Sequence, residues 1–475
     1  MHKPRHAEDV TPPLVLNGAA TWRWYASFLR DPLACFEAAK GRLPPITLLQ
    51  NPIPFMPGGR RFLFAYGADA NRFVLGHPDL FRSGGQVLVG PKDSAHYRLR
   101  RGIFAMNGDT HRAQRRAMQP PFLKPVVATY APIMAQLIDD VLDQWRVGDT
   151  LDIYREMRKL SNWVAAYILF GSEDFHESVR MGETIERWLL LDTQARSSLM
   201  WADLPGTSYG RLLRQAEVLE TAIKNAIARI RRGKMDGTDA LTELIRSHDS
   251  GTTDMSETDM VAHAVILYAA SFETTANALA WTLYLVAQHT ELAAELCREV
   301  HTQLVDWPPE AEEIERLSLM EGVVKESLRL FPPVAHTLRT ADGDAELAGL
   351  NLAGGDKVIL CHYLTHRDPD VFPEPNRFRP ARWRATRTDH YEYAAFSAGP
   401  RICLGMSFAL LELKLTLARI LQRFRFRVVP GAAIEGTIQL TLRPKSTIPM
   451  QILPLHDEFA ASPVVGNIHR MVDTT

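Results

Sequence analysis

The chain has 475 residues, 46% of them hydrophobic and 23% charged, which is the composition of a folded globular protein and excludes a disordered one. The formal net charge is −1, so the overall charge predicts no nucleic-acid partner and no anionic membrane surface. The four cysteines show neither a CxxC pair nor metal-ligand spacing, which favours a reducing, cytoplasmic location. The polar N-terminus lacks the apolar stretch of a signal peptide or membrane anchor, so we expect a soluble protein.

Helical periodicity predominates along the chain and predicts a mainly α-helical protein with small β-sheets. Helices are predicted over residues 127–145, 151–170, 182–191, 211–232, 256–288, 292–304, 319–330 and 406–424. Short strands are predicted at residues 61–65, 358–361, 438–442 and 448–453. Neither a linker nor a repeat divides the sequence, so we expect residues 1–475 to form a single domain, with residues 456–475 as a loose C-terminal tail.

The longest apolar segment, residues 260–287, has the length of a membrane span but is interrupted by polar residues. A capping pattern from Ser256 to Asp259 precedes it, and this pattern starts helices in water. We therefore predict a helix buried on all sides in a large core. Within it, Glu273 and Thr274 place an acid beside an alcohol where an apolar core favours neither, which indicates a functional pair.

The strongest single signal is the segment Phe396-Ser-Ala-Gly-Pro-Arg-Ile-Cys-Leu-Gly405, followed at once by a predicted helix. Its two glycines, Gly399 and Gly405, allow a tight turn and a close approach to a flat cofactor. The loop delivers the Cys403 sulfur to a helix start, where free amide groups and the helix dipole lower the pKa of a thiol. We interpret the other cysteines as small hydrophobic core residues. They are Cys35, Cys297 and Cys361.

This segment resembles the haem-binding signature of the cytochromes P450 at Phe396, Gly399, Arg401, Cys403 and Gly405. The resemblance extends over about residues 31–453 and implies the cytochrome P450 fold, mainly α with small β-sheets. In that fold, haem b (iron protoporphyrin IX) lies between a long central helix and the loop–helix that carries the cysteine. The resemblance also implies that the iron is bound by Cys403 and that Phe396 and Gly405 contact the haem.

A second group of residues resembles the buried Glu-Arg-Arg network of the family. Glu326 and Arg329 lie three residues apart on one helical face, where they can pair. Arg382 lies in the later segment Phe-Arg-Pro-Ala-Arg-Trp. The resemblance implies a structural role for all three residues.

The two haem propionates need cations or hydrogen-bond donors, because a buried carboxylate without partners is costly. The resemblance assigns this task to His111, Arg115, Arg339 and Arg401. Many relatives carry tryptophan at the position of His111.

The acid and alcohol of the long helix match the oxygen-activation motif of the family, except that Ser271 stands where glycine is usual. The Ser271 hydroxyl is expected to bond the backbone carbonyl four residues earlier. The resemblance implies that Glu273 and Thr274 pass protons to the oxygen that the haem activates, while the thiolate promotes O–O cleavage. The expected reaction inserts one atom of O2 into a C–H or C=C bond.

Two other functions remain open from the sequence. One is a P450-fold enzyme that uses peroxide or catalyses a rearrangement, and such enzymes commonly lack the acid–alcohol pair. The other is a haem-based sensor or carrier. For the monooxygenase we expect a monomer that receives electrons from a separate ferredoxin or flavodoxin with its NAD(P)H reductase, docked near Arg112 and Arg116.

The expected substrate is a hydrophobic small molecule of the terpenoid, steroid, fatty acid or polyketide class. The resemblance draws the pocket from Ala269, Ala270, Val334, Ala335 and Leu442. Cations in the segment 81–106 could also meet a substrate carboxylate, although we interpret each as a solvated surface charge. They are Arg82, Lys92, Arg98 and Arg100.

Overall fold

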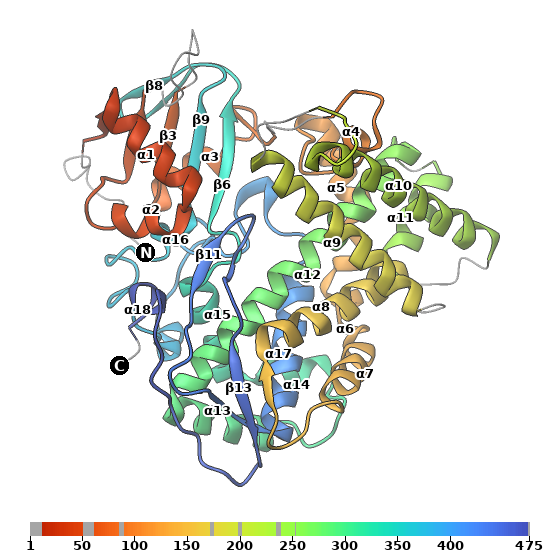
Figure 1. Ribbon diagram of the computed structural model, residues 1–475, viewed down its shortest axis with the longest axis vertical. Helices are drawn as coiled ribbons and strands as arrows, with labels where there is room; N and C mark the ends of the chain where they lie inside the picture. The colour runs from red at the N-terminus through yellow and green to blue at the C-terminus, as the bar shows by residue number, and fades with distance from the viewer. Residues whose placement is uncertain are drawn as a thin grey trace.

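The protein is described by a computed structural model, which covers residues 12–50, 61–84, 90–171, 175–197, 202–233, 239–251 and 253–473. The chain forms a large helical body and a smaller region built around a β-sheet (Figure 1). The predicted fold class, mainly helical with small sheets, is confirmed. Among the described residues, no helix combines the length and apolar character that crossing a membrane requires.

The largest sheet joins segments from the two ends of the sequence. Its strand order is β1-β2-β3-β9-β6-β4. The bounds are β1 Leu14–Leu16, β2 Ile46–Leu49, β3 Phe62–Ala65, β4 Phe81–Arg82, β6 His336–Ala341 and β9 Lys357–Cys361. Strands β3 and β9 confirm the predicted strands at 61–65 and 358–361, and they pair with each other in parallel.

Strand β3 has a core on each of its faces because successive side chains of a strand point in opposite directions. On one face, Phe36 of α2 (Pro32–Ala39) stacks on Phe64, and the ring of Trp24 of α1 (Ala19–Arg30) packs against Phe64 at a tilt. On the other face, Leu63 belongs to a second cluster with Leu75 of α3 (Ala68–Gly76). The sheet is therefore covered on both sides and can hold its neighbours rigidly.

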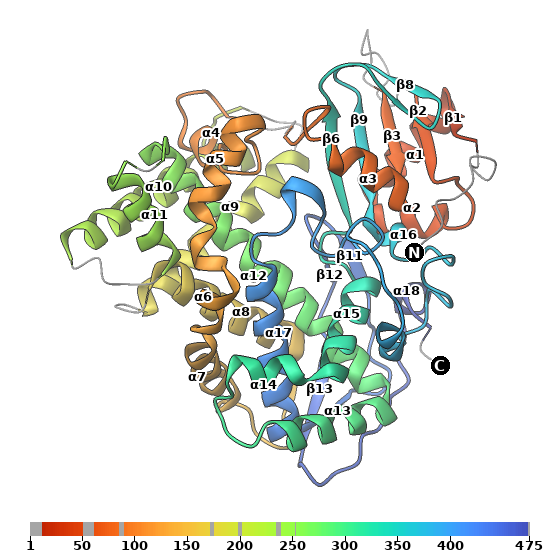
Figure 2. The same cartoon turned by 180° about the vertical axis from the view of Figure 1, so that it is seen from behind.

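The helical body is centred on α12, whose 32 residues run through its middle (Figure 1). Ser256 caps this helix in a capping box with Asp259, as the sequence predicts. Helices α8 and α17 pack directly on α12, and Figure 2 shows α17 beside it. The bounds are α4 Ala95–Leu99, α5 Gly108–Met118, α6 Lys124–Ala128, α7 Ala131–Leu142, α8 Ile153–Phe170, α9 Phe175–Ser197, α10 Ser208–Arg232, α11 Ala240–Asp249, α12 Glu257–Gln288, α13 Thr290–Gln303, α14 Ala311–Arg316, α15 Ser318–Leu330, α16 His362–Thr365, α17 Met406–Arg423 and α18 Ile468–Met471.

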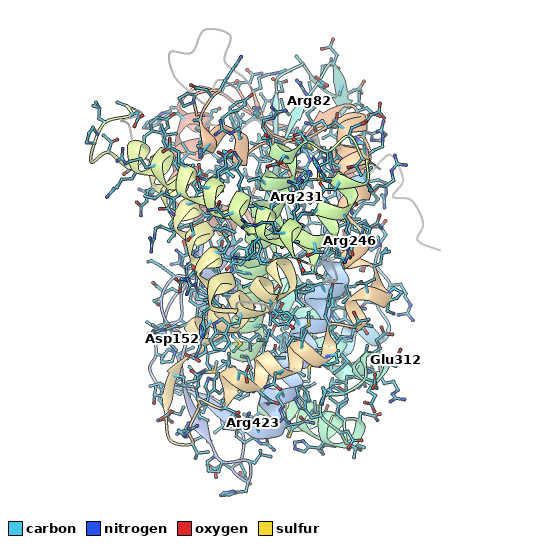
Figure 3. All side chains as sticks on the ribbon, turned by 90° about the vertical axis from the view of Figure 1, so that its right-hand side faces the viewer. Arg82, Asp152, Arg231, Arg246, Glu312 and Arg423 are labelled. Carbon is cyan, nitrogen blue, oxygen red and sulfur yellow. The ribbon has the colours of Figure 1, made fainter. Side chains whose placement is uncertain are left out.

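Three small sheets complete the fold. The strand orders are β10-β13-β5, β11-β12 and β7-β8, with β5 Thr150–Asp152, β7 Ala345–Leu347, β8 Leu350–Leu352, β10 Arg425–Val428, β11 Gly436–Ile438, β12 Leu442–Pro444 and β13 Pro449–Leu453. Asp152, labelled in Figure 3, accepts hydrogen bonds from the backbone N–H groups of Tyr154 and Ile448. It thereby caps α8 and ties that helix to the C-terminal strands.

Two predicted elements are wrong in their continuity. The helix predicted over 127–145 is interrupted after Ala128, and α7 starts at Ala131 because Pro132, which has no N–H to donate, fits only in a first helical turn. The strand predicted over 438–442 is a hairpin, in which residues 439–441 turn between β11 and β12. In both cases the apolar periodicity of the sequence continues across a position where the chain changes direction.

The loose C-terminal tail is also a wrong prediction. Four of its apolar residues are buried, although Val465 is exposed, and α18 lies in this segment. Arg367 donates a hydrogen bond to the Met471 carbonyl at 2.8 Å. The buried residues of this segment are Val464, Ile468, Met471 and Val472. Their spacing is too sparse for a periodic signal, yet each one fills a place in the core.

Candidate active site

The loop before α17 turns tightly and brings Cys403 to the first turn of that helix. Ser397 and Gly399 both adopt left-handed backbone angles, and the Cys403 N–H donates to the Phe396 carbonyl at 2.8 Å. A Cβ on Gly399 would lie 2.4 Å from the Leu75 carbonyl oxygen, so the glycine is required by packing on α3. A Cβ on Gly405 would meet nothing within 4 Å, which indicates open space beside the start of α17.

The Cys403 side chain faces an interior space. Its surface is exposed, yet burial raises the pKa of the thiol above its ordinary value. Both observations are explained if the sulfur faces a cavity that is enclosed by protein. A hydrogen bond from the Gly405 N–H and the positive charge of Arg115 act in the opposite direction. The predicted stabilising groups are thus present, but the predicted lowering of the pKa is wrong because desolvation outweighs them.

Four cationic or donor side chains gather beside this loop. Arg115 on α5 donates to the Ile402 carbonyl at 2.7 Å, and Arg401 donates to the Met106 carbonyl and to the Asn107 side chain. Arg339 on β6 is only 8% exposed and donates to the Leu338 carbonyl. His111, one turn before Arg115, is buried as well. The sequence predicted this group, and the structure brings all four together.

The electrostatics of the four side chains show that they are close to one another. Burial and then the charge of Arg401 lower the pKa of Arg339 to about 10. Burial and then the charge of Arg115 lower the pKa of Arg401 to about 10. Burial, followed by Arg401, Arg115 and other arginines, lowers the pKa of His111 to about 4, so its imidazole is neutral near pH 7. The three guanidinium groups therefore lie close together in a region with little access to solvent.

This cluster fits the propionates of a haem. Within the described part of the chain, none of the three arginines has a carboxylate within 4 Å, and the buried Nε atom of Arg401 has no hydrogen-bond partner. Buried cations without counter-ions are costly, and two propionates would supply the missing negative charge. A thiolate at Cys403 would bind the iron of the same group. The residues present thus fit the cofactor.

The Glu326 carboxylate accepts hydrogen bonds from both arginines that the sequence predicted as its partners. Arg329 donates to it from Nε and Nη2 at 2.9 and 2.8 Å, and Arg382 donates from Nε at 2.9 Å. The Trp383 indole and the Arg379 N–H also donate to it. Both arginines further donate to backbone carbonyls of residues 366–377. A fully bonded, fully buried ion network thus ties α15 to the segment before the cysteine loop.

The acid and alcohol of α12 are held by different partners. Thr274 donates its hydroxyl proton to the Ala270 carbonyl at 2.7 Å. The Glu273 carboxylate accepts a hydrogen bond from Thr441 at 2.7 Å, and Thr441 accepts one from the Asn277 amide at 3.0 Å. Neither Thr441 nor Asn277 was predicted, because residues far apart in sequence without a motif carry no local signal. Ser271 bonds the Tyr268 carbonyl, three residues earlier rather than four.

The predicted pocket residues divide into two groups. Ala270 is exposed in the middle of α12, Ala269 is half-buried, and Val334 is 38% exposed. Ala335 and Leu442 are buried in the core, so their prediction as pocket surface is wrong. Large apolar side chains in segments 81–106 and 440–442 are exposed instead. They are Phe104 and Leu440.

Three of the four cations considered for substrate binding form ion pairs, two of them with carboxylates that are largely buried. Arg98 forms a two-pronged ion pair with Glu220 of α10, and Arg100 forms one with Asp192 of α9. These two ion pairs join α4 and the residue at its C-terminal end to helices α10 and α9. Arg98 and Arg100 are therefore neither solvated surface charges nor open anchors. Arg82 pairs with Asp342, whereas Lys92 is exposed.

Fold, cysteine loop and cation cluster together define a haem-thiolate protein, and the comparisons agree. The family model described as "Cytochrome P450" matches residues 53–450. The chain belongs to the cytochrome P450 family, and the predicted enzyme class, cytochrome P450 monooxygenase, is confirmed. Membership implies a haem cofactor, O2, redox partners and a hydrophobic substrate.

Several bacterial relatives are similar over most of their length. Cyclooctat-9-en-7-ol 5-monooxygenase of Streptomyces melanosporofaciens is 30% identical over 430 residues, which is 89% of each chain. Cyclooctatin synthase of the same organism is 30% identical and covers 80% of this chain and 83% of its own. A solved structure of cyanobacterial CYP120A1 with bound retinoic acid has a TM-score of 0.79 at 24% identity, and covers 94% of this chain and 99% of its own. That structure supports the fold.

Proposed function

We propose that this chain is a haem-thiolate monooxygenase that inserts one oxygen atom from O2 into a hydrophobic small molecule. The observation that carries the proposal is the place of Cys403 beside three arginines without carboxylate partners in the described structure. The acid–alcohol pair on α12 favours oxygen activation over peroxide use, rearrangement, sensing or carriage, since those functions do not need it.

The chain's own residues bind and orient the cofactor, for which we propose haem b. Cys403 is the iron ligand, and the Gly405 N–H stabilises its negative charge. Arg115, Arg339 and Arg401 neutralise the propionates, and neutral His111 adds one N–H donor. Phe396 and Gly405 lie at the two ends of the cysteine loop, in position to pack on the ring. When bound, a thiolate-ligated haem supplies the cleavage of the O–O bond.

The polar residues of α12 handle protons. Because the Thr274 hydroxyl gives its proton to the Ala270 carbonyl, its oxygen lone pairs can accept a hydrogen bond from a proton-bearing group on the exposed side of the helix. Glu273 is the group that takes protons from solvent and passes them on. Ser271 gives its proton to the Tyr268 carbonyl, so its hydroxyl oxygen is a second acceptor one turn away.

The test of this proposal separates electron use from product formation. Thr274→Ala should fold, bind haem and consume reduced nicotinamide through a surrogate ferredoxin and reductase, but release much of it as hydrogen peroxide. Glu273→Gln should slow oxygen consumption itself, on the order of 100-fold, because a general acid is lost. Peroxide yield and oxygen uptake are measured in the same assay.

The double variant Ser271→Gly with Thr274→Ala controls for replacement of one hydroxyl by the other. Its peroxide yield should equal or exceed that of the single variant. An undiminished product yield per electron in the double variant would refute the proton role of this helix, and unchanged oxygen uptake in Glu273→Gln would refute the role of the acid.

For the substrate we propose a terpenoid. One Streptomyces relative is named as a 5-monooxygenase of cyclooctat-9-en-7-ol and the other as cyclooctatin synthase, and the exposed side chains expected to line the pocket here are apolar. These are Phe104 and Val334, beside Ala269 and Ala270 of α12.

We propose further that a separate ferredoxin or flavodoxin, served by an NAD(P)H reductase, docks on the exposed face of α5. Arg115 of this helix touches the cysteine loop, so its neighbours lie close to the cofactor. Arg116 is exposed, and Arg112 is exposed but paired with Asp109. A cytoplasmic monomer formed as one domain stays a prediction from the sequence.

A further inference from the structure

A pocket of about 270 Å³ lies next to Glu273. Four elements supply its walls: α8, α9, α12 and the β11–β12 hairpin. Leu190 is 53% exposed and Leu440 is 61% exposed, so the pocket opens to solvent. A water molecule occupies roughly 30 Å³ in the liquid. The space is therefore large enough for several waters beside the carboxylate.

The walls of this pocket combine polar groups that can bind water with apolar side chains, which are those of Tyr154, Leu189, Leu190, Phe272 and Leu440. Arg158 of α8 forms an ion pair with Glu186 of α9, and both line it together with Glu273. Arg443 donates to Gln439, and both of these residues also line it. Each of these groups can hydrogen-bond to water, which bridges polar groups at little cost. Arg158 also lies over the ring of Phe272, the residue before Glu273, which fixes it beside the acid.

The direction of the hydrogen bonds around Thr441 orients the acid. The Asn277 amide donates to the Thr441 hydroxyl oxygen, so the single hydroxyl proton is free to point at Glu273. Asn277 is completely buried on α12 and Thr441 is 4% exposed in the hairpin turn. This buried series of hydrogen bonds favours a single arrangement, which fixes the position of the Glu273 carboxylate.

We propose that this pocket is the route by which protons reach Glu273 from solvent, and that Thr441, held by Asn277, is the positioning residue that keeps the carboxylate at its inner end. The proposal rests on the role of Glu273 in the proposed function. It adds the route that protons take from solvent before they reach Glu273. A proton from bulk solvent passes along the pocket water to a Glu273 carboxylate oxygen, so each water regains the proton it gives up. Glu273 then releases a proton toward the haem side of α12 and returns to the carboxylate, so no net charge accumulates.

The test compares Thr441→Val with Thr441→Ser in the haem-loaded protein. Valine has nearly the shape of threonine but no hydroxyl, so the carboxylate loses its donor. A misplaced catalytic group can cost roughly 100-fold in rate. We therefore expect Thr441→Val to slow oxygen uptake by about 10- to 100-fold and to increase its solvent deuterium isotope effect, whereas Thr441→Ser restores both. Thr437→Val, in strand β11 of the same hairpin, is the matched control and should behave like the wild type.

Two structural readouts do not depend on activity. High-resolution crystal structures should show ordered water between the Arg158–Glu186 pair and Glu273, and a displaced carboxylate in Thr441→Val. Leu190→Trp should fill the pocket, remove that water and increase the isotope effect with Thr441 intact. A dry pocket, or a Thr441→Val variant with wild-type uptake and isotope effect, would overturn the path while Glu273→Gln still slows uptake. If Glu273→Gln is also without effect, the proposed function itself fails.

Discussion

Glu326→Gln is expected to destabilise the fold more than any other single polar change described above. The substitution removes the negative charge to which Arg329 and Arg382 donate, and it leaves two guanidinium groups in a site where Glu326 and Arg329 are 0% exposed. Breaking a buried ion pair by removing one partner costs about 3–5 kcal/mol. Chemical unfolding followed by circular dichroism should show this loss in the free energy of unfolding, with lower haem retention.

Glu374 offers a matched control in the same part of the molecule. It also pairs with two arginines, Arg377 and Arg379, but its side chain is 41% exposed. Exposed pairs contribute about 0–1 kcal/mol, so Glu374→Gln should change the free energy of unfolding by less than that. Equal effects of the two substitutions would show that burial of the network contributes nothing.

The second large effect is a loss of stability in mild acid. Burial lowers the pKa of His263 and His336 to about 4 and that of His362 to about 3. The pKa of His111 is lowered to about 4, and that of His366 lies well below its ordinary value. The unfolded chain binds protons at these imidazoles near pH 6.5, whereas the folded protein does so only near pH 4 or lower. Stability is therefore full above pH 6.5 and is lost as the pH falls from 6.5 toward 4.

One carboxyl group opposes this trend. Burial raises the pKa of Glu412 to about 8, so between pH 6.5 and 4.5 it is protonated in the folded state and ionised in the unfolded state. The histidines outnumber it, so the free energy of unfolding should still fall as the pH is lowered, by about 1.4 kcal/mol per pH unit for each proton that the unfolded chain binds in excess. Denaturant titrations between pH 7.5 and 4.5 measure this slope. His263→Gln should reduce it by about 1.4 kcal/mol per pH unit, whereas the surface variant His456→Gln should not.

Sequence reasoning performed well where chemistry is local. The cysteine loop, the capping box of α12 and the Glu326–Arg329 spacing each lie within a few residues, and each is present in the structure. The four propionate candidates are scattered along the chain, and only the family resemblance joined them. Their cluster forms because α5, β6 and the cysteine loop converge in the fold.

The failures of sequence reasoning have a common physical cause, which is tertiary contact. Leu442 is buried and its N–H donates to the carbonyl of Pro333 in the segment after α15, whereas Leu440 in the hairpin turn is exposed. Thr441 meets Glu273 over 168 residues of sequence separation. Arg98 and Arg100 find partners on α9 and α10, which no local pattern places near them. Periodicity identifies helices and strands but not the residues that meet when they pack.

The most direct test of the assignment is the carbon monoxide difference spectrum of the reduced, haem-loaded protein, recorded for the wild type and for Cys403→Ala. The Cys297→Ala variant, which changes a buried cysteine of α13, is the control. The wild type and Cys297→Ala should give the spectrum typical of a thiolate-bound haem. Cys403→Ala should remain folded and either lack haem or bind it without that spectrum. Persistence of the thiolate-type spectrum in Cys403→Ala would contradict the assignment of Cys403 as the iron ligand.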